Sequence, residues 1–81
     1  MNIYVGNLSP KTTALQLRKA FERFGKVATV SLSQRPRDVT AYGFCFVEMP
    51  FEKEASRAID ELDGSMLGGC TLSIKESGVS I

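Results

Sequence analysis

Residues 42–49, YGFCFVEM, constrain the fold more than any other stretch, because two different kinds of side chain alternate along them. Alternate residues of a β-strand point to opposite faces of a sheet. One face would carry Gly43, Cys45, Val47 and Met49, and the other Tyr42, Phe44, Phe46 and Glu48. Since an unpaired carboxylate is costly to bury, we expect the second set, with its three rings, to face solvent.

Two amphipathic helices are expected on either side of this region. The first begins at T-A-L-Q, from Thr13 to Gln16, which has the spacing of a capping box, and it ends at Gly25. The second is Phe51–Leu62. Apolar residues recur in both at helical spacing, namely Ala14, Leu17, Phe21 and Phe24, and then Ala55, Ala58, Ile59 and Leu62.

The remaining elements are short strands and turns. The predicted strands are Asn2–Val5, Val27–Ser33, Ala41–Met49 and Thr71–Lys75. The predicted turns and loops are Gly6-Asn7, Gln34–Thr40, Asp63-Gly64 and Gly68-Gly69, and residues 76–81 are expected to be a frayed tail. The chain is thus expected to form one domain over residues 1–76, followed by a tail over residues 77–81.

The order βαββαβ predicts an α+β, ferredoxin-like sandwich, with a four-stranded antiparallel sheet and two helices on one face. The other face is then left toward solvent. Alternation directs Ile3, Val5, Leu72 and Ile74 inward, and Tyr4, Thr29, Ser31, Ser33, Thr71, Ser73 and Lys75 outward. A contiguous exposed aromatic patch on a small domain indicates a binding site. The alternative is that a second chain, or the tail through Val79 and Ile81, covers the rings.

Composition excludes several classes of function. The chain has 81 residues, two cysteines and no histidine, so we expect no metal site and no cofactor. We expect Cys45 and Cys70 to be two reduced, core-lining thiols, with a disulfide between them as the alternative. No stretch is long and apolar enough to span a bilayer, and no signal peptide is visible, so we expect a cytoplasmic location. Net charge is +5 over residues 1–47 and −4 over residues 48–81. This asymmetry indicates either a polarised surface or two solvated helix faces of opposite sign.

Two motifs resemble those of the RNA recognition motif family. IYVGNL, residues 3–8, is similar to the family's hexamer motif at all six positions. YGFCFVEM is similar to its octamer motif at Gly43, Phe44, Phe46 and Val47. L-x-x-x-F-x-x-F-G from Leu17 and A-x-x-A-I-x-x-L-D-G from Ala55 follow the family's usual order. The resemblance covers nearly the whole chain, and it is closest to the bacterial single-domain RNA-binding proteins.

The resemblance implies a role for each matching residue. Tyr4 and Phe44 would each stack a base, and Phe46 would pack against the sugars between them. Tyr42 stands where the family usually has Arg or Lys on a phosphate; its ring could stack, or its hydroxyl could donate. Candidate backbone contacts are Arg35 and Arg37, with Lys75 and Lys26 secondary, although Arg35 and Arg37 could equally belong to an idle solvated loop. Main-chain groups after Ile74 would bind base edges.

Single-stranded RNA is therefore the expected partner, with single-stranded DNA a second candidate, and no membrane or small-molecule substrate is expected. A monomer is expected. The alternative function is a protein-binding module that acts through its helical face, although such domains tend to lose the sheet aromatics. An enzyme is not expected, because the chain offers no nucleophile–base pair and no clustered cysteines.

Overall fold

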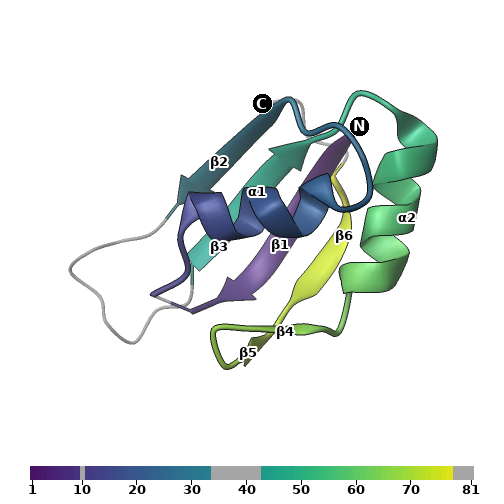
Figure 1. The fold of residues 1–81 in the computed structure, drawn as a ribbon. Coiled ribbons are helices and arrows are strands. Elements are labelled where there is room, and N and C mark those ends of the chain that lie inside the picture. The colour runs from purple at the N-terminus through teal and green to yellow at the C-terminus, as the bar shows by residue number, and fades with distance from the viewer. Residues whose placement is uncertain (10, 34–42, 78–81) are drawn as a thin grey trace.

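The structure, a computed structural model, describes residues 1–9, 11–33 and 43–77. Its main layer is a four-stranded antiparallel sheet in the order β2-β3-β1-β6. The strands are β1 (Asn2–Leu8), β2 (Thr29–Ser33), β3 (Gly43–Glu48) and β6 (Ser73–Ser77). Both helices, α1 (Ala14–Glu22) and α2 (Glu52–Leu62), lie on one side of this sheet (Figure 1). The predicted ferredoxin-like α+β fold is confirmed.

The start of α1 is fixed by the predicted capping box. The Gln16 main-chain N–H donates to Thr13 Oγ1 at 3.2 Å, and the Thr13 N–H donates to Gln16 Oε1 at 3.0 Å. These bonds satisfy two amides at a helix end that would otherwise lack partners. Helix α1 ends earlier than predicted, at Glu22, with Arg23 as its C-cap.

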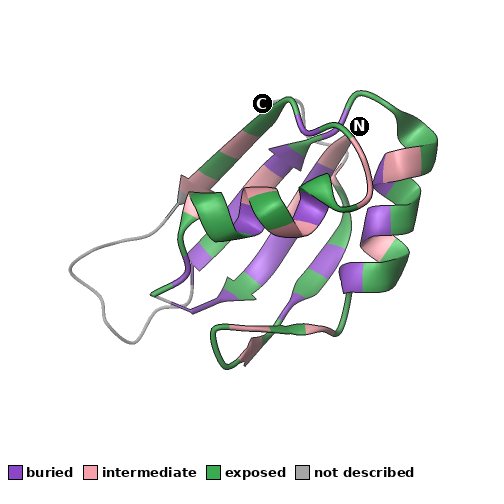
Figure 2. Ribbon diagram, in the orientation of Figure 1, coloured by how far each residue is buried: buried purple, intermediate pink, exposed green. Residues whose placement is uncertain are grey.

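The core lies between the helices and the sheet, and it contains the side chains that alternation directs inward (Figure 2). The helices contribute Leu17, Phe21, Ala55, Ala58 and Leu62, and the strands contribute Ile3, Val5, Cys45, Val47 and Ile74. Met49, just after β3, and Leu72, between β5 and β6, complete this set. All of these are at most 8% exposed. Both cysteines are free, as predicted. Cys45 lines the core, but the prediction was wrong for Cys70, which is only half-buried and lies in a hairpin outside the core.

The predicted turn at Gly6-Asn7 is a bulge inside a longer strand. β1 continues to Leu8, and its register against β3 shifts between Val5 and Leu8. Asn7 adopts a positive φ of 60°, and its side-chain amide donates to the Thr71 carbonyl at 2.7 Å. Because Gly6 pairs with Ser73 in β6, the strand retains a partner where the dipeptide alone predicts a stop.

The C-terminal region contains a hairpin that was not predicted. β4 (Met66–Leu67) pairs with β5 (Cys70–Thr71) around Gly68 and Gly69, whose φ values of 62° and 83° are typical of a two-residue hairpin turn. The predicted strand Thr71–Lys75 is divided at Leu72, whose backbone bonds to Ser65 and Gly64. β6 then continues to Ser77, so Glu76 and Ser77 pair with β1 rather than fraying.

Among the described residues, no helix has both the length and the apolar character needed to cross a bilayer.

Candidate nucleic-acid interface

The sheet face turned away from the helices, which we call the open face, carries its side chains in cross-strand rows. The central row contains Ser31, Phe46, Tyr4 and Lys75, which lie opposite one another in β2, β3, β1 and β6. The next row contains Thr29, Glu48, Asn2 and Ser77. We call this second set the polar row. The register therefore brings residues that are far apart in sequence onto one surface.

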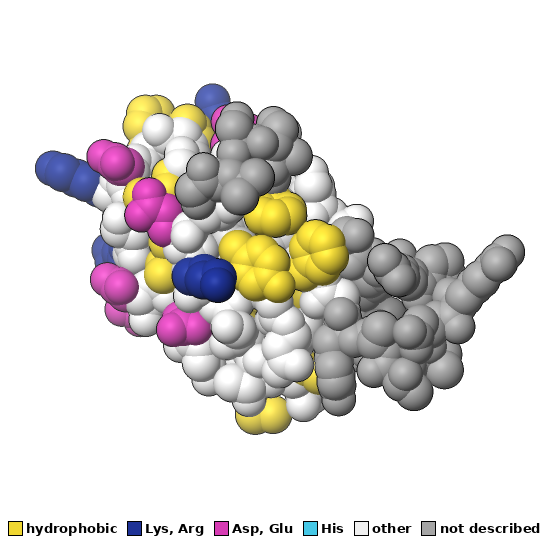
Figure 3. Space-filling view, turned by 180° about the vertical axis from the view of Figure 1, so that it is seen from behind, with side chains coloured by type: hydrophobic (Ala, Val, Ile, Leu, Met, Phe, Trp, Pro, Cys, Tyr) yellow, Lys and Arg dark blue, Asp and Glu magenta, His cyan; other side chains and the backbone are white. Residues whose placement is uncertain are grey.

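Tyr4, Phe44 and Phe46 form one aromatic cluster on the open face. The rings of Tyr4 and Phe44 are stacked, with centroids 6.1 Å apart and planes 22° from parallel. Phe46 meets both rings edge-on, at 5.6 Å from Tyr4 and 5.8 Å from Phe44. Hydrophobic side chains gather at the centre of this face in the space-filling view (Figure 3). The predicted outward direction of these three residues is confirmed.

Gly6 leaves room for the Tyr4 ring to lie against the sheet. A Cβ added to Gly6 would lie only 2.9 Å from Tyr4 Cε1, which is closer than real Cβ atoms approach. Gly6 and Tyr4 have the same parity on β1, so the ring covers the position where the next outward side chain would stand. The glycine thus allows Tyr4 to extend toward Phe44.

Exposure of these rings lowers the stability of the unbound protein. Phe44 is 40% exposed, although its strand neighbour Cys45 is wholly buried in the core. Full burial of a phenylalanine would contribute roughly 1.5–3 kcal/mol, which this arrangement partly forgoes. A contiguous aromatic surface on a small domain is typical of a binding site. Val79 and Ile81, the tail residues considered as a cover for the rings, lie outside the described residues.

Lys75 lies at the edge of the aromatic cluster. Its Nζ is 5.4 Å from the centroid of the Tyr4 ring, within the range of a cation–π interaction. Lys75 is exposed and lies directly opposite Tyr4 in the register of β1 and β6. Of the basic residues predicted to contact RNA, it is the one that the described residues bring to the rings.

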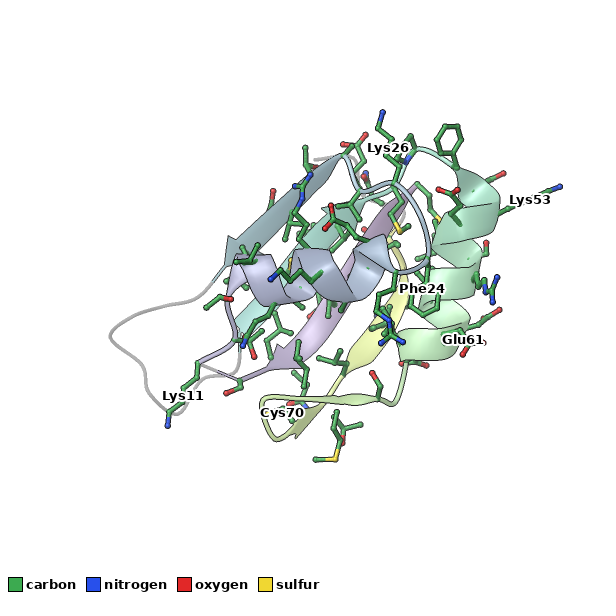
Figure 4. All side chains as sticks on the ribbon, in the orientation of Figure 1. Lys11, Phe24, Lys26, Lys53, Glu61 and Cys70 are labelled. Carbon is green, nitrogen blue, oxygen red and sulfur yellow. The ribbon has the colours of Figure 1, made fainter. Side chains whose placement is uncertain are left out.

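Four other residues were predicted to contact RNA. Tyr42, Arg35 and Arg37 lie outside the described residues. Lys26 is described, but it lies in the loop between α1 and β2, where its main-chain N–H donates to Glu54 Oε1 in α2 at 2.9 Å. Figure 4 shows its side chain at the end of the molecule, so the structure does not bring Lys26 to the aromatic cluster.

Glu48 and Asn2 lie next to the rings, although no functional role was predicted for either residue. Asn2 precedes Tyr4 by two residues, and Glu48 follows Phe46 by two, so each shares the open face. Glu48 Oε2 accepts a hydrogen bond from Thr29 Oγ1 at 3.3 Å. Strand parity was the available signal, because it had already placed Glu48 outward.

The helical side offers a different kind of surface. A groove of about 310 Å³ lies between the helices and β4, and it is lined in part by Phe24, Leu62, Leu67 and Leu72. Phe24 lies between the two helices, and Glu61 projects from α2 nearby (Figure 4). Several of these apolar side chains pack against the core, so the groove is an indentation of the core surface rather than a second exposed aromatic patch.

Two known proteins have sequences similar to this chain. Cytotoxic granule-associated RNA binding protein tiar-1 of Caenorhabditis elegans is 34% identical over 71 residues, which are 88% of this chain and 17% of that protein. Putative RNA-binding protein RbpD of Nostoc sp. is 38% identical over 77 residues, which are 95% of this chain and 82% of that protein. The chain thus spans a small part of tiar-1 but most of RbpD.

One solved structure and one family model also match most of this chain. The crystal structure of RNA Binding Protein PG1 is 35% identical and superposes with a TM-score of 0.87, covering 100% of this chain and 98% of that one. The family model for the RNA recognition motif matches residues 3–73. These residues include both motifs, both helices and the strands that carry the aromatic cluster, and the chain therefore belongs to the RNA recognition motif family.

Proposed function

We propose that this protein binds single-stranded RNA by stacking bases on the aromatic cluster of Tyr4, Phe44 and Phe46. The observation that carries the proposal is that the three rings contact one another on a sheet face that neither helix covers. Single-stranded RNA is read largely by splaying its bases onto aromatic side chains. Family membership supports the same function.

The free energy of stacking is sufficient to displace the lysine that now lies over Tyr4. A cation–π contact at an exposed site contributes about 0.5–1 kcal/mol, whereas a base stacked on an aromatic ring contributes about 1–3 kcal/mol. An arriving base would therefore replace Lys75 at the ring. The ammonium group would then be available to contact a phosphate, with Arg35 and Arg37 as the other proposed backbone contacts and Tyr42 as a further stacking or hydroxyl contact.

The protein would act by binding RNA rather than by catalysing a reaction. Stacking and phosphate contacts need neither a cofactor nor a small-molecule substrate. Single-stranded DNA is a second proposed ligand, because every base has a face that can stack. We propose that the protein binds as a monomer and acts in the cytoplasm.

The double variant Phe44→Ala with Phe46→Ala tests the proposal. We expect RNA binding to be lost in a fluorescence titration with a labelled eight-nucleotide RNA, while circular dichroism shows that the fold persists. Phe51→Ala is the matched control, because Phe51 is 56% exposed but lies outside the sheet, at the N-cap of α2. Unchanged RNA affinity in the folded double variant would contradict the stacking mechanism.

A further inference from the structure

Glu48 is a carboxylate on the surface proposed to bind a polyanion. It is exposed, and it lies in the polar row between Thr29 and Asn2. Its nearest neighbours on the open face include Phe46, two residues earlier on the same strand, and Tyr4, diagonally across on β1. A negative charge here opposes the approach of phosphates to this part of the face. The nucleotide group next to Glu48 should therefore be something other than a phosphate.

The Glu48 carboxylate accepts hydrogen bonds and donates none. It offers about four lone-pair positions on its two oxygens. The Thr29 hydroxyl occupies one of them, donating to Oε2 at 3.3 Å. This bond restrains the side chain along the sheet and leaves capacity for a further pair of donors. The complementary ligand group is a base edge with two adjacent N–H donors.

We propose that Glu48 determines base specificity and selects guanine at the position adjacent to the aromatic cluster; the proposal rests on the proposed function. Guanine has N1–H and N2–H side by side on its Watson–Crick edge, which matches two carboxylate oxygens. Uracil has a single N3–H between two carbonyl oxygens. In cytosine and adenine the amino group lies next to a ring nitrogen that accepts. Each of these three bases would place an acceptor against the carboxylate.

The spacing on the sheet allows this contact. Residues two apart on one strand are separated by roughly 7 Å, and diagonal partners on neighbouring strands by about 7–8 Å. A base that lies flat over Tyr4 or Phe46 extends its edge across most of that separation, and a hydrogen bond spans the rest. Stacking and edge recognition would then act on the same nucleotide.

The test uses eight-nucleotide oligouridines that contain one central guanosine, inosine or adenosine, with all-uridine RNA as reference. Inosine retains N1–H but lacks the 2-amino group. For the wild-type protein we expect the guanosine RNA to bind at least about fivefold more tightly than the all-uridine RNA, with inosine intermediate. In Glu48→Gln, guanosine and inosine RNAs should bind equally, while affinity for all-uridine RNA is unchanged or higher.

Glu76→Gln is the matched control, since it removes the same charge from an exposed carboxylate on β6. Glu76 pairs with the inward-facing Ile3 and borders α2 rather than the rings. This variant should retain the guanosine preference. A wild-type protein that binds all four RNAs equally, or a preference that survives in Glu48→Gln, would overturn the assignment but not the proposed function. A wild-type protein that binds none of the RNAs would overturn both.

Discussion

Neighbouring residues of β3 lie on opposite faces of the sheet, one open and one buried. Phe44 and Phe46 lie on the open face, whereas Cys45 between them is wholly buried beneath the helices. Burial raises the pKa of the Cys45 thiol from 9.0 to about 11, because the thiolate would lose its hydration; a hydrogen bond from the Ser31 backbone acts in the opposite direction. The residue therefore behaves as a small core side chain rather than as a nucleophile.

The two cysteines should differ in reactivity. In the native protein at pH 8, we expect iodoacetamide to modify the half-buried Cys70 and to leave Cys45 unmodified until denaturant is added. Peptide mass spectrometry measures the extent of modification at each position. Rapid modification of Cys45 in the folded protein would show that the core beneath the rings opens readily.

The raised pKa of Cys45 also predicts how stability depends on pH. The folded state holds the thiol proton more tightly than the unfolded state, so this contribution is complete below about pH 9 and is lost as pH rises toward 11. Urea denaturation between pH 8 and 11 should show the free energy of unfolding falling more steeply for the wild type than for Cys45→Ala. Equal pH dependence of the free energy of unfolding in the two proteins would contradict the raised pKa of Cys45.

Among the elements, the helices were predictable because the sequence signals that define them, a capping box in α1 and an apolar stripe in α2, are local. Thr13 and Gln16 cap α1 as their spacing predicts, and Ala55, Ala58 and Leu62 form the buried stripe of α2. The direction of the aromatic residues was predictable for the same reason, since strand parity alone determines it. Family resemblance then supplied roles for Tyr4 and Phe44 that parity could not.

The errors arose where contacts distant in sequence decide the structure. Gly6-Asn7 reads locally as a turn, but pairing with β6 and the Asn7 bond to Thr71 keep the strand in place. The division of the last predicted strand depends on Leu72 bonding back to Ser65, with Asp63 Oδ1 accepting from the Ile74 N–H at 2.9 Å. The polar row depends on register between three strand pairs, which a single sequence does not reveal.

The capping box of α1 gives a prediction at this scale. Thr13→Ala removes the hydroxyl that accepts from the Gln16 amide, and we expect the free energy of unfolding to fall by about 1 kcal/mol. Ser56→Ala, at an exposed position within α2, is the control and should leave stability unchanged or slightly higher. Urea denaturation measures both. Equal stability of the two variants would mean that the cap contributes nothing.

In the molecule as a whole, the part of the open face that the structure describes carries little positive charge. Within the described residues, the central and polar rows contain one cation, Lys75, and one anion, Glu48. The exposed acidic residues of α2 lie in the other layer (Figure 1). Binding should therefore depend more on stacking than on counterion release, with few phosphates neutralised.

The dependence of RNA affinity on salt concentration measures how much phosphate contacts contribute relative to stacking. If Lys75, Arg35 and Arg37 each neutralise one phosphate, log affinity should fall with log salt concentration with a slope of about −2. Lys75→Gln should make that slope shallower by about 0.7, whereas Lys53→Gln, which removes a charge projecting from α2, should leave it unchanged (Figure 4). Equal slopes for wild type and Lys75→Gln would remove Lys75 from the phosphate contacts.

We expect RNA to bind the open face and not the helical face. The most direct measurement is a titration of nitrogen-15-labelled protein with an eight-nucleotide RNA, followed through the amide signals. We predict that the signals that move are those of β1 and β3, together with β6 near Lys75, while those of α1 and α2 stay in place. Movement concentrated along α1, α2 and the groove at Phe24, with the strand amides unchanged, would show that RNA binds the helical face instead.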